Sequence, residues 1–208
     1  FIDKIVSVSS EIKPFNHSAV IYNGIKAKQL TLMPSKHVNL IFAGRLIPSK
    51  NIMFLLDSFA YCNAKKPNTF ELHIFGDGEL YSHIASSKLP QVTLHGFVEN
   101  YLAELPQNSI LVNPSLFEGM PMAVVEALSS GLPTLLSSIA PHREIKEHIE
   151  DGVAMFDNNK QSFYQALTGL LSDKNEVTYD RKKMKQCVDA HFSDISMAEQ
   201  YIQAYEDL

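Results

Sequence analysis

The chain has 208 residues, of which 45% are hydrophobic and 20% are charged, and its formal net charge is −5. This composition excludes disordered and fibrous proteins, and the negative charge argues against a nucleic-acid-binding protein that works by neutralising phosphates. The length suits one large domain or one and a half, with a substantial buried core. The two cysteines, Cys62 and Cys187, form no CxxC pair, so neither a disulfide framework nor a zinc site is predicted.

The apolar runs are strand-sized, so no transmembrane helix is predicted. The chain begins Phe1-Ile2-Asp3, without a Met or a signal-peptide pattern. We expect a piece of a longer cytoplasmic protein, for which peripheral association with the inner face of the membrane is a further option.

From residue 38 onward, short apolar runs alternate with stretches of helical periodicity. Strands are predicted at 38–44, 70–76, 91–94, 109–112, 134–137 and 153–156. Helices are predicted between them at 51–66, 79–88, 100–105 and 120–130. This alternation is typical of βαβ crossovers, in which helices cover both faces of a parallel sheet. We therefore predict the α/β class, with a Rossmann-like doubly wound parallel sheet of about six strands.

The two ends of the chain differ from this middle part. Residues 3–9 are predicted to form a single strand, followed by a polar connector and a turn at Asn23-Gly24. After the last strand, helices are predicted at 160–172, 179–190 and 194–206. The last of these has apolar residues at helical spacing and is expected to pack on a surface. They are Ile195, Met197, Ala198, Tyr201, Ile202 and Tyr205.

Ligands of parallel sheets bind beyond the carboxyl ends of the strands, so the residues that follow each strand matter most. Gly44, Arg45 and Lys50 follow the first strand of this series. A glycine turn, a guanidinium and an ammonium at the entrance to a helix favour an anion such as a phosphate. Two solvated basic residues at a helix start are the simpler interpretation, and the spacing is not that of a P-loop. Gly76, after the second strand, allows either a tight turn or the close approach of a ligand.

Two carboxylates follow the fourth strand of this series. Glu118 lies just before the predicted helix and Glu126 within it, at most ~12 Å apart along the helix axis. With the amides of Gly119 and Met120 between them, they would suit a nucleotide-sugar. Glu118 could instead pair with the helix dipole, and Glu126 could lie on a solvated face. However, Glu126 interrupts an apolar run, and a carboxylate in such a position usually has a partner.

These segments resemble, in order and at family spacing, the retaining nucleotide-sugar glycosyltransferases of the GT-B fold, glycosyltransferase family 4. Residues 44–51 resemble the family's G-R-L…K-G segment, with Asn51 where glycine is common. Residues 114–133 are similar to its E-x7-E signature and trailing G-x-P. Residues 94–98 resemble the segment that lines the nucleobase pocket, and residues 20–25 the hinge that enters the C-terminal domain.

The resemblance implies a role for each matched residue. Arg45 and Lys50 would hold the donor diphosphate, Glu118 would contact the sugar hydroxyls, and Glu126 would bind the ribose. The remaining donor-binding residues would be Gly44, Gly76, Phe97, Val98, Gly119, Met120 and Pro121. Glu118 could also be a covalent nucleophile, but the resemblance favours front-face attack.

The resemblance also implies a division of the chain and a set of partners. Residues 1–19 would be a remnant of the N-terminal domain, 20–190 the donor-binding domain, and 191–208 a return helix. Without its own sheet, the first strand would be displaced, paired with another chain, or added to the remaining sheet. A glycan or lipid-linked acceptor would bind through the missing N-terminal domain, and no nucleic acid is expected.

The implied function is retaining, hexosyl-type sugar transfer in bacterial capsule or lipopolysaccharide synthesis, with a nucleotide-diphosphate sugar as donor. Neither a cofactor nor a metal is expected. The spacing of His142 and His148 does not place two metal ligands on one helix face. Both histidines are predicted to be surface residues. Two alternatives remain, a non-catalytic nucleotide-binding module and a GT-B-fold nucleotide-sugar epimerase. The intact charged residues argue against the first alternative, and the E-x7-E spacing argues against the second.

Overall fold

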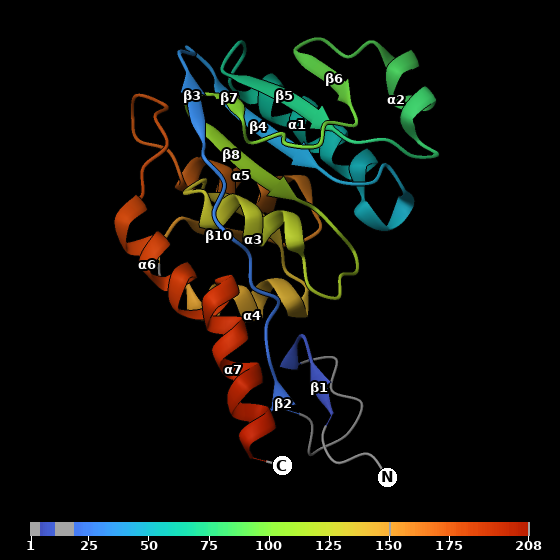
Figure 1. Cartoon of the computed structure of the whole chain (residues 1–208). Helices are drawn as coiled ribbons and strands as arrows, with labels where there is room; N and C mark the ends of the chain where they lie inside the picture. The colour runs from blue at the N-terminus through green and yellow to red at the C-terminus, as the bar shows by residue number, and fades with distance from the viewer. Residues whose placement is uncertain (1–4, 11–18, 150, 208) are drawn as a thin grey trace.

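The computed structural model describes residues 5–10, 19–149 and 151–207 (Figure 1). Six strands form one parallel sheet, as the sequence predicts. They are β4 (Val38–Ala43), β5 (Phe70–Phe75), β6 (Val92–Gly96), β8 (Ser109–Asn113), β9 (Thr134–Ser137) and β10 (Val153–Phe156). Their order across the sheet is β10-β9-β8-β4-β5-β6. The strand order therefore reverses between β4 and β8, and in doubly wound sheets ligands bind at such a switch point.

Helices pack on both faces of the sheet. The α-helices of the described part are α1 (Ile52–Lys65), α2 (Tyr81–Ser87), α3 (Met122–Ser129), α4 (Ala140–His148), α5 (Lys160–Gly169), α6 (Arg181–Phe192) and α7 (Asp194–Glu206), of which α7 packs against α6. Three of them begin at a residue whose side chain accepts a backbone N–H of the first turn, as helix caps do: Asn159, Asp180 and Ser193. These local signals make α5, α6 and α7 predictable from sequence.

The central strand β4 divides its side chains between two hydrophobic cores. Leu40 and Phe42 pack with α1 and α5 on one face of the sheet, and Ile41 packs with α3 and α6 on the other. All three side chains are buried. A strand that is buried on both faces reads as a continuous apolar run, which is why residues 38–43 are easily recognised in the sequence.

The predicted helix at 100–105 is wrong. Residues 99–102 form a turn instead, and β7 (Glu104–Pro106) pairs in parallel with β3 (Thr31–Met33), a strand that the sequence did not reveal. Tyr101, Leu102 and Leu105 are all buried, so their helix-like spacing reflects packing onto the core rather than a helix. The segment is also too short for a stable helix before Pro106 ends it.

The strand expected at 3–9 is reduced to β1 (Val6–Ser7), and residues 3 and 4 lie outside the described part. β1 pairs in parallel with β2 (Ala19–Val20), apart from the six-stranded sheet. It is therefore displaced from the main sheet, one of the three arrangements expected, and its partner strand belongs to this same chain. The chain then joins the C-terminal helices, because Ile25 bridges Ser193.

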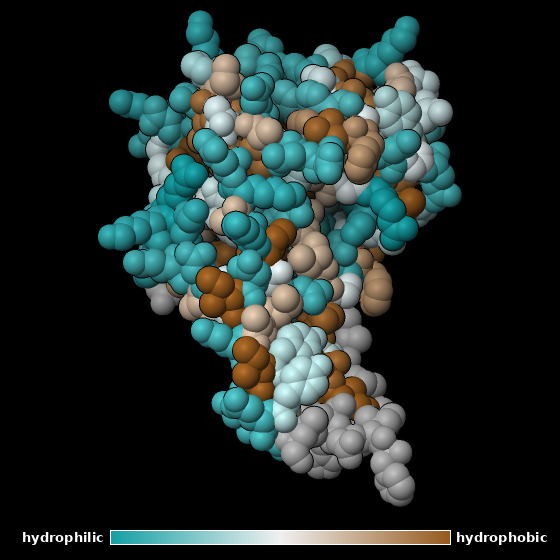
Figure 2. Space-filling model, in the orientation of Figure 1, coloured by the Kyte–Doolittle hydropathy of each residue, from teal (hydrophilic) through white to brown (hydrophobic). Residues whose placement is uncertain are grey.

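Helix α7 presents apolar side chains to the surface, as its sequence pattern indicated. Ile195, Ile202 and Tyr205 are all more than half exposed. In the lower part of Figure 2, hydrophobic side chains reach the surface where Figure 1 places α7. None of the described residues of this helix is buried. Its apolar face is therefore largely uncovered in this structure.

Candidate functional site

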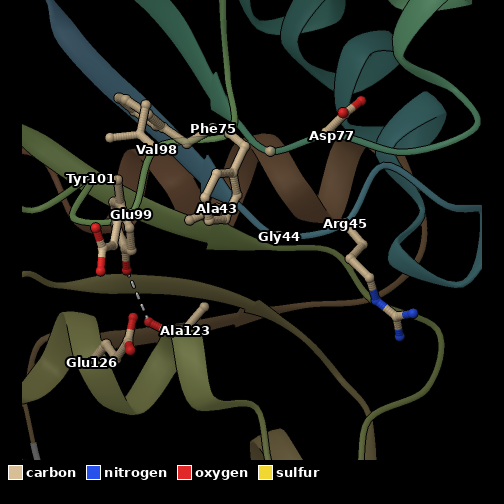
Figure 3. A pocket seen from close by; sticks show the side chains of 12 residues that line it. Ala43, Gly44, Arg45, Phe75, Asp77, Val98, Glu99, Tyr101, Ala123 and Glu126 are labelled. Atoms are coloured by element: carbon tan, nitrogen blue, oxygen red, sulfur yellow. Dashed lines mark hydrogen bonds between the residues drawn. The ribbon is translucent and has the colours of Figure 1, made fainter.

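A cavity of about 670 Å³ opens at the carboxyl ends of β4 and β5, next to the switch point between β4 and β8 (Figure 3). Six of the residues predicted as site residues line it: Gly44, Arg45, Gly76, Phe97, Val98 and Glu126. They come from four separate segments of the chain. The structure therefore brings together the strand ends that the sequence pattern singled out.

The cavity has an apolar wall between charged ends. Phe75 and Tyr101 contribute aromatic rings to the wall, with Phe75 stacked on His95 at 4.2 Å between ring centroids. Figure 3 shows Arg45 at one end and the carboxylates of Glu99 and Glu126 at the other. A ligand with a flat apolar ring, hydroxyl groups and an anionic group would find matching chemistry here.

The strand ends approach one another closely because of a glycine. Gly76 has a φ of +149°, and a Cβ atom at this position would lie 1.8 Å from the carbonyl oxygen of Gly44. Its N–H donates to the carbonyl of Gly96 at 2.7 Å, which joins the ends of β5 and β6. Only glycine fits this backbone position. Gly76 therefore contributes to the cavity because it has no side chain, which lets the ends of β4 and β5 lie close together.

Lys50 and Glu118 do not line this cavity, but they form a tight ion pair with each other, with 2.6 Å between Nζ and Oε1. The same carboxylate oxygen accepts hydrogen bonds from Ser115 Oγ at 2.7 Å and Asn113 Nδ2 at 3.2 Å. Burial alone would raise the pKa of Glu118, but the hydrogen bonds from these three residues outweigh it and the pKa is lowered. Glu118 is therefore ionised at neutral pH. The hydrogen bonds that Asn113 and Ser115 donate to Glu118 were not predicted from the sequence.

Backbone geometry holds the two halves of this ion pair together. Lys50 ends a 3-10 turn (Pro48–Lys50), and the carbonyl of Ser49 in that turn accepts the N–H of Leu116 at 2.9 Å. The next residue, Asn51, has a φ of 55°. Asparagine tolerates this left-handed conformation better than most residues, which explains how it can replace the glycine common in family 4.

The loop between β8 and α3 carries the remaining predicted residues, Gly119, Met120 and Pro121. The predicted helix at 120–130 starts later than expected, at Met122, and Pro121 precedes it. The amides of Gly119 and Met120 therefore lie in the loop before the helix, beside Glu118.

Glu126 has the partner that its apolar neighbourhood indicated. Lys28 Nζ lies 3.5 Å from Glu126 Oε1, and Lys28 belongs to the connector between β2 and β3. One turn earlier on α3, the Ala123 carbonyl accepts a hydrogen bond from Tyr101 at 3.2 Å, shown dashed in Figure 3. The role of Lys28 could not be predicted from the sequence, because the contact spans 98 residues.

The prediction that His142 and His148 are surface residues is wrong. His142 is fully buried and His148 is half-buried. The segment forms α4, a helix that was not predicted from the sequence: its buried residues are the apolar Pro141 and Ile145 together with the polar His142 and Glu144, so polar side chains interrupt the apolar face that would mark the helix. His142 contacts the end of β9, where its Nδ1 lies 2.9 Å from the Ser137 carbonyl oxygen.

Within the described residues, no group of three or more histidine, cysteine, aspartate and glutamate side chains is placed to hold a metal ion. The helices of the same described part are all too short or too polar to cross a membrane.

Residues 37–173 match the family described as Glycosyl transferases group 1. The chain belongs to this family. Among curated relatives, this glycosyltransferase domain is 32% identical over 164 residues to UDP-Gal:alpha-D-GlcNAc-diphosphoundecaprenol alpha-1,3-galactosyltransferase of Escherichia coli, which covers 75% of the chain and 42% of that protein. It is 24% identical over 201 residues to the capsular polysaccharide biosynthesis glycosyltransferase CapH of Staphylococcus aureus, covering 93% of the chain and 54% of that protein.

Solved structures show the same fold. The lipopolysaccharide outer core galactosyltransferase WaaB matches with a TM-score of 0.73 at 20% identity, over 99% of this chain and 62% of that one. Anabaena Alr3699/HepE in complex with UDP-glucose matches with a TM-score of 0.71 at 17% identity, over 100% of this chain and 65% of that one. The glycosyltransferase domain thus corresponds to part of a GT-B structure, and it spans about half the length of the curated relatives it matches.

Proposed function

We propose that the chain is the donor-binding domain of a retaining, hexosyl-type glycosyltransferase. It would bind a nucleotide-diphosphate sugar and present the sugar to a glycan or lipid-linked acceptor, in bacterial polysaccharide synthesis. The observation that carries this proposal is the site itself: a cavity with Arg45 and Glu126 at opposite ends, together with the Lys50–Glu118 pair on the loops that follow β4 and β8. Membership of the family and the names of the relatives support it.

The lining of the cavity suggests how a donor would lie in it. The nucleobase would rest against the apolar wall near Phe97 and Val98, and the ribose hydroxyls would donate to Glu126. The diphosphate would then face Arg45 and Lys50, which carry the positive charges at this end. Glu118 would accept hydrogen bonds from the sugar hydroxyls, which an ionised carboxylate can do.

The chemistry of transfer fits these roles. When the glycosidic bond to phosphate breaks, negative charge grows on the leaving nucleoside diphosphate, and fixed cations stabilise it most when they are already in position. The ion pair with Glu118 orients Lys50 in advance. Because Glu118 Oε1 already accepts three hydrogen bonds, we favour sugar positioning over covalent attack for this carboxylate.

The described apolar face of α7 also belongs to this proposal. Ile195, Ile202 and Tyr205 would pack against an acceptor-binding domain in a full-length enzyme, which would give residues 191–208 the role of a return helix. In this division, residues 20–190 hold the donor and residues 1–19 derive from the acceptor domain. The acceptor itself would contact that second domain.

Calorimetry of this chain with UDP, GDP, ADP and dTDP tests donor binding directly. We expect at least one to bind, and Arg45→Ala and Glu126→Ala each to weaken that binding about tenfold, as the loss of a charged hydrogen bond does. Lys182→Ala, which removes a charge from the exposed side of α6, is the control and should bind normally. Failure of every nucleotide to bind at millimolar concentration would reject the donor-binding role. Conversion of the donor sugar to its epimer by a full-length enzyme would favour the epimerase alternative.

A further inference from the structure

Behind Glu118, a chain of hydrogen bonds runs into the interior and ends at His142. Ser115 Oγ donates to Glu118 Oε1 at 2.7 Å, and Ser137 Oγ donates to the carbonyl oxygen of Ser115 at 2.6 Å. His142 Nδ1 lies 2.9 Å from the carbonyl oxygen of Ser137. A carbonyl oxygen only accepts, so Nδ1 carries the proton in this contact. Each link therefore has a defined donor and acceptor.

The chain of hydrogen bonds joins three separate elements of the fold. Ser115 and Glu118 belong to the loop between β8 and α3, Ser137 ends β9, and His142 lies in the first turn of α4. All four residues are buried, with Ser115 and His142 at 0% exposure. Water therefore has little access to replace a lost link. The position of the Glu118 carboxylate depends on groups that lie far from it in sequence.

His142 is a neutral imidazole in this environment. Burial lowers its pKa to about 4, and the charges of Glu118 and Lys50 act on it in opposite directions. Since Nδ1 holds the proton, Nε2 carries a lone pair, and within the described residues it has no hydrogen-bond partner. Only the Nδ1 side of the ring is thus anchored by the protein.

We propose that His142 is a positioning residue of the donor site, which acts through Ser137 and Ser115 to fix the carboxylate of Glu118 toward the donor sugar. This inference rests on the proposed function, because it assigns Glu118 to the sugar. His142 itself touches no substrate, since its side chain is fully buried. Its contribution is the single N–H that holds the end of β9, and with it the Ser137 hydroxyl, against the loop that carries Glu118.

A matched pair of substitutions separates this role from simple packing. Asparagine and leucine have nearly the same shape, and both leave the same space where the outer part of the imidazole was. His142→Asn keeps an N–H close to the position of Nδ1, whereas His142→Leu has none. Because Nε2 has no protein partner, its loss in both variants removes no hydrogen bond within the described structure. The difference between the two variants therefore reports the polar contacts on this side of the ring, where Nδ1 lies 2.9 Å from the Ser137 carbonyl oxygen and 3.2 Å from Ser137 Oγ.

The first measurement needs no ligand: the pKa of Glu118, followed by carboxyl carbon NMR of this chain. We expect His142→Leu to raise the Glu118 pKa, because the Ser115 hydroxyl loses its fixed position and one stabilising hydrogen bond weakens. His142→Asn should leave it close to that of the wild type. Equal Glu118 pKa values in the two variants would overturn the proposal and reduce His142 to a packing residue.

The second measurement uses calorimetry to compare the affinities for UDP-galactose and UDP. If another nucleoside diphosphate of the panel above binds, its affinity is compared with that of its hexose derivative in the same way. His142→Leu should lower the affinity for the nucleotide-sugar about tenfold and leave that for the nucleoside diphosphate within about twofold. Equal losses for both ligands, or equal losses in both variants, would contradict a role through Glu118. If the wild type binds no nucleotide, the proposed function fails while the NMR result still decides whether His142 positions Glu118.

Discussion

Lys50 and Glu118 lie 68 positions apart in sequence, yet their charged atoms are 2.6 Å apart and the Glu118 side chain is only 9% exposed. Two charges in such a place stabilise the fold only as a pair, because each of them has given up most of its contact with water. Both residues are also proposed to act on the donor. The resting site is therefore organised before a donor arrives.

Breaking this ion pair from either side should destabilise the chain. Lys50→Met leaves an uncompensated carboxylate, and we expect a loss of about 2–4 kcal/mol in the free energy of unfolding, measured with urea. Glu118→Gln should also destabilise, but the double variant should lose less than the sum of the two single variants, because the partners interact directly. Strict additivity would show that the two charges do not interact in solution.

Sugar transfer should depend strongly on Glu118. In a full-length enzyme that carries this domain, Glu118→Ala should lower the rate of transfer by roughly 10²–10³-fold, as the loss of a fixed electrostatic group in an active site does. The affinity for the nucleoside diphosphate should change much less, because the carboxylate is assigned to the sugar. Mass spectrometry of the products measures the rate, and near-normal turnover would reject the assignment of Glu118.

Glu144 on α4 should hold the N-terminal segment in place. Its carboxylate accepts hydrogen bonds from Ser9 Oγ at 2.6 Å, the Ser10 N–H at 2.6 Å and Tyr22 Oη at 2.8 Å. Glu144→Gln should speed hydrogen exchange at the Ser10 amide and cost about 1–2 kcal/mol of stability. Glu147→Gln, an exposed change on the same helix, is the control. Unchanged exchange at Ser10 would mean that the segment is held by other contacts.

The carboxylate of Glu144 should also affect how the stability of the chain depends on acidic pH. Burial alone would raise the pKa of Glu144, but the hydrogen bonds from Ser10, Ser9 and Tyr22 outweigh it and the pKa is lowered. The unfolded chain then binds protons at a higher pH than the folded chain does. The contribution of Glu144 to the free energy of unfolding is present above the pKa that this carboxyl has in the unfolded chain. It is lost as the pH falls through the pKa of the folded chain. Thermal unfolding of Glu144→Gln should therefore show a smaller loss of stability on acidification than the wild type.

His142 should add a separate pH dependence at a higher pH. Its folded pKa of about 4 lies below the ordinary value of 6.5, so between these values the unfolded chain binds more protons than the folded chain. The free energy of unfolding should therefore rise with pH across this window, by up to about 1.4 kcal/mol per pH unit. The difference in the free energy of unfolding between the wild type and His142→Asn, measured as a function of pH, isolates the contribution of His142. A difference that does not vary with pH would show that folding does not lower the pKa of His142.

Much of the site could be predicted because its segments follow recognisable strands. Arg45 follows the apolar strand β4 and a glycine, and Glu118 precedes the helix α3, so the parallel sheet places both at the same edge. The ion pair between Lys50 and Glu118 could not be predicted, because it depends on how a 3-10 turn and a distant loop pack together. The same holds for Lys28, which meets Glu126 only through the folded connector.

The sequence by itself determined the alternating α/β architecture, the six parallel strands and the segments at their carboxyl ends, because these follow from local apolar periodicity and turn residues. The tertiary structure alone decided the turn at 99–102, the strand pair β3–β7 and the helix α4. In α4, the polar residues His142 and Glu144 are buried beside Pro141 and Ile145, and hydrogen bonds to Ser137 and to the distant Ser9 make their burial possible. The hydrogen-bond partners of these buried side chains depend on how separate elements pack together, and they cannot be predicted from the hydropathy pattern of the sequence.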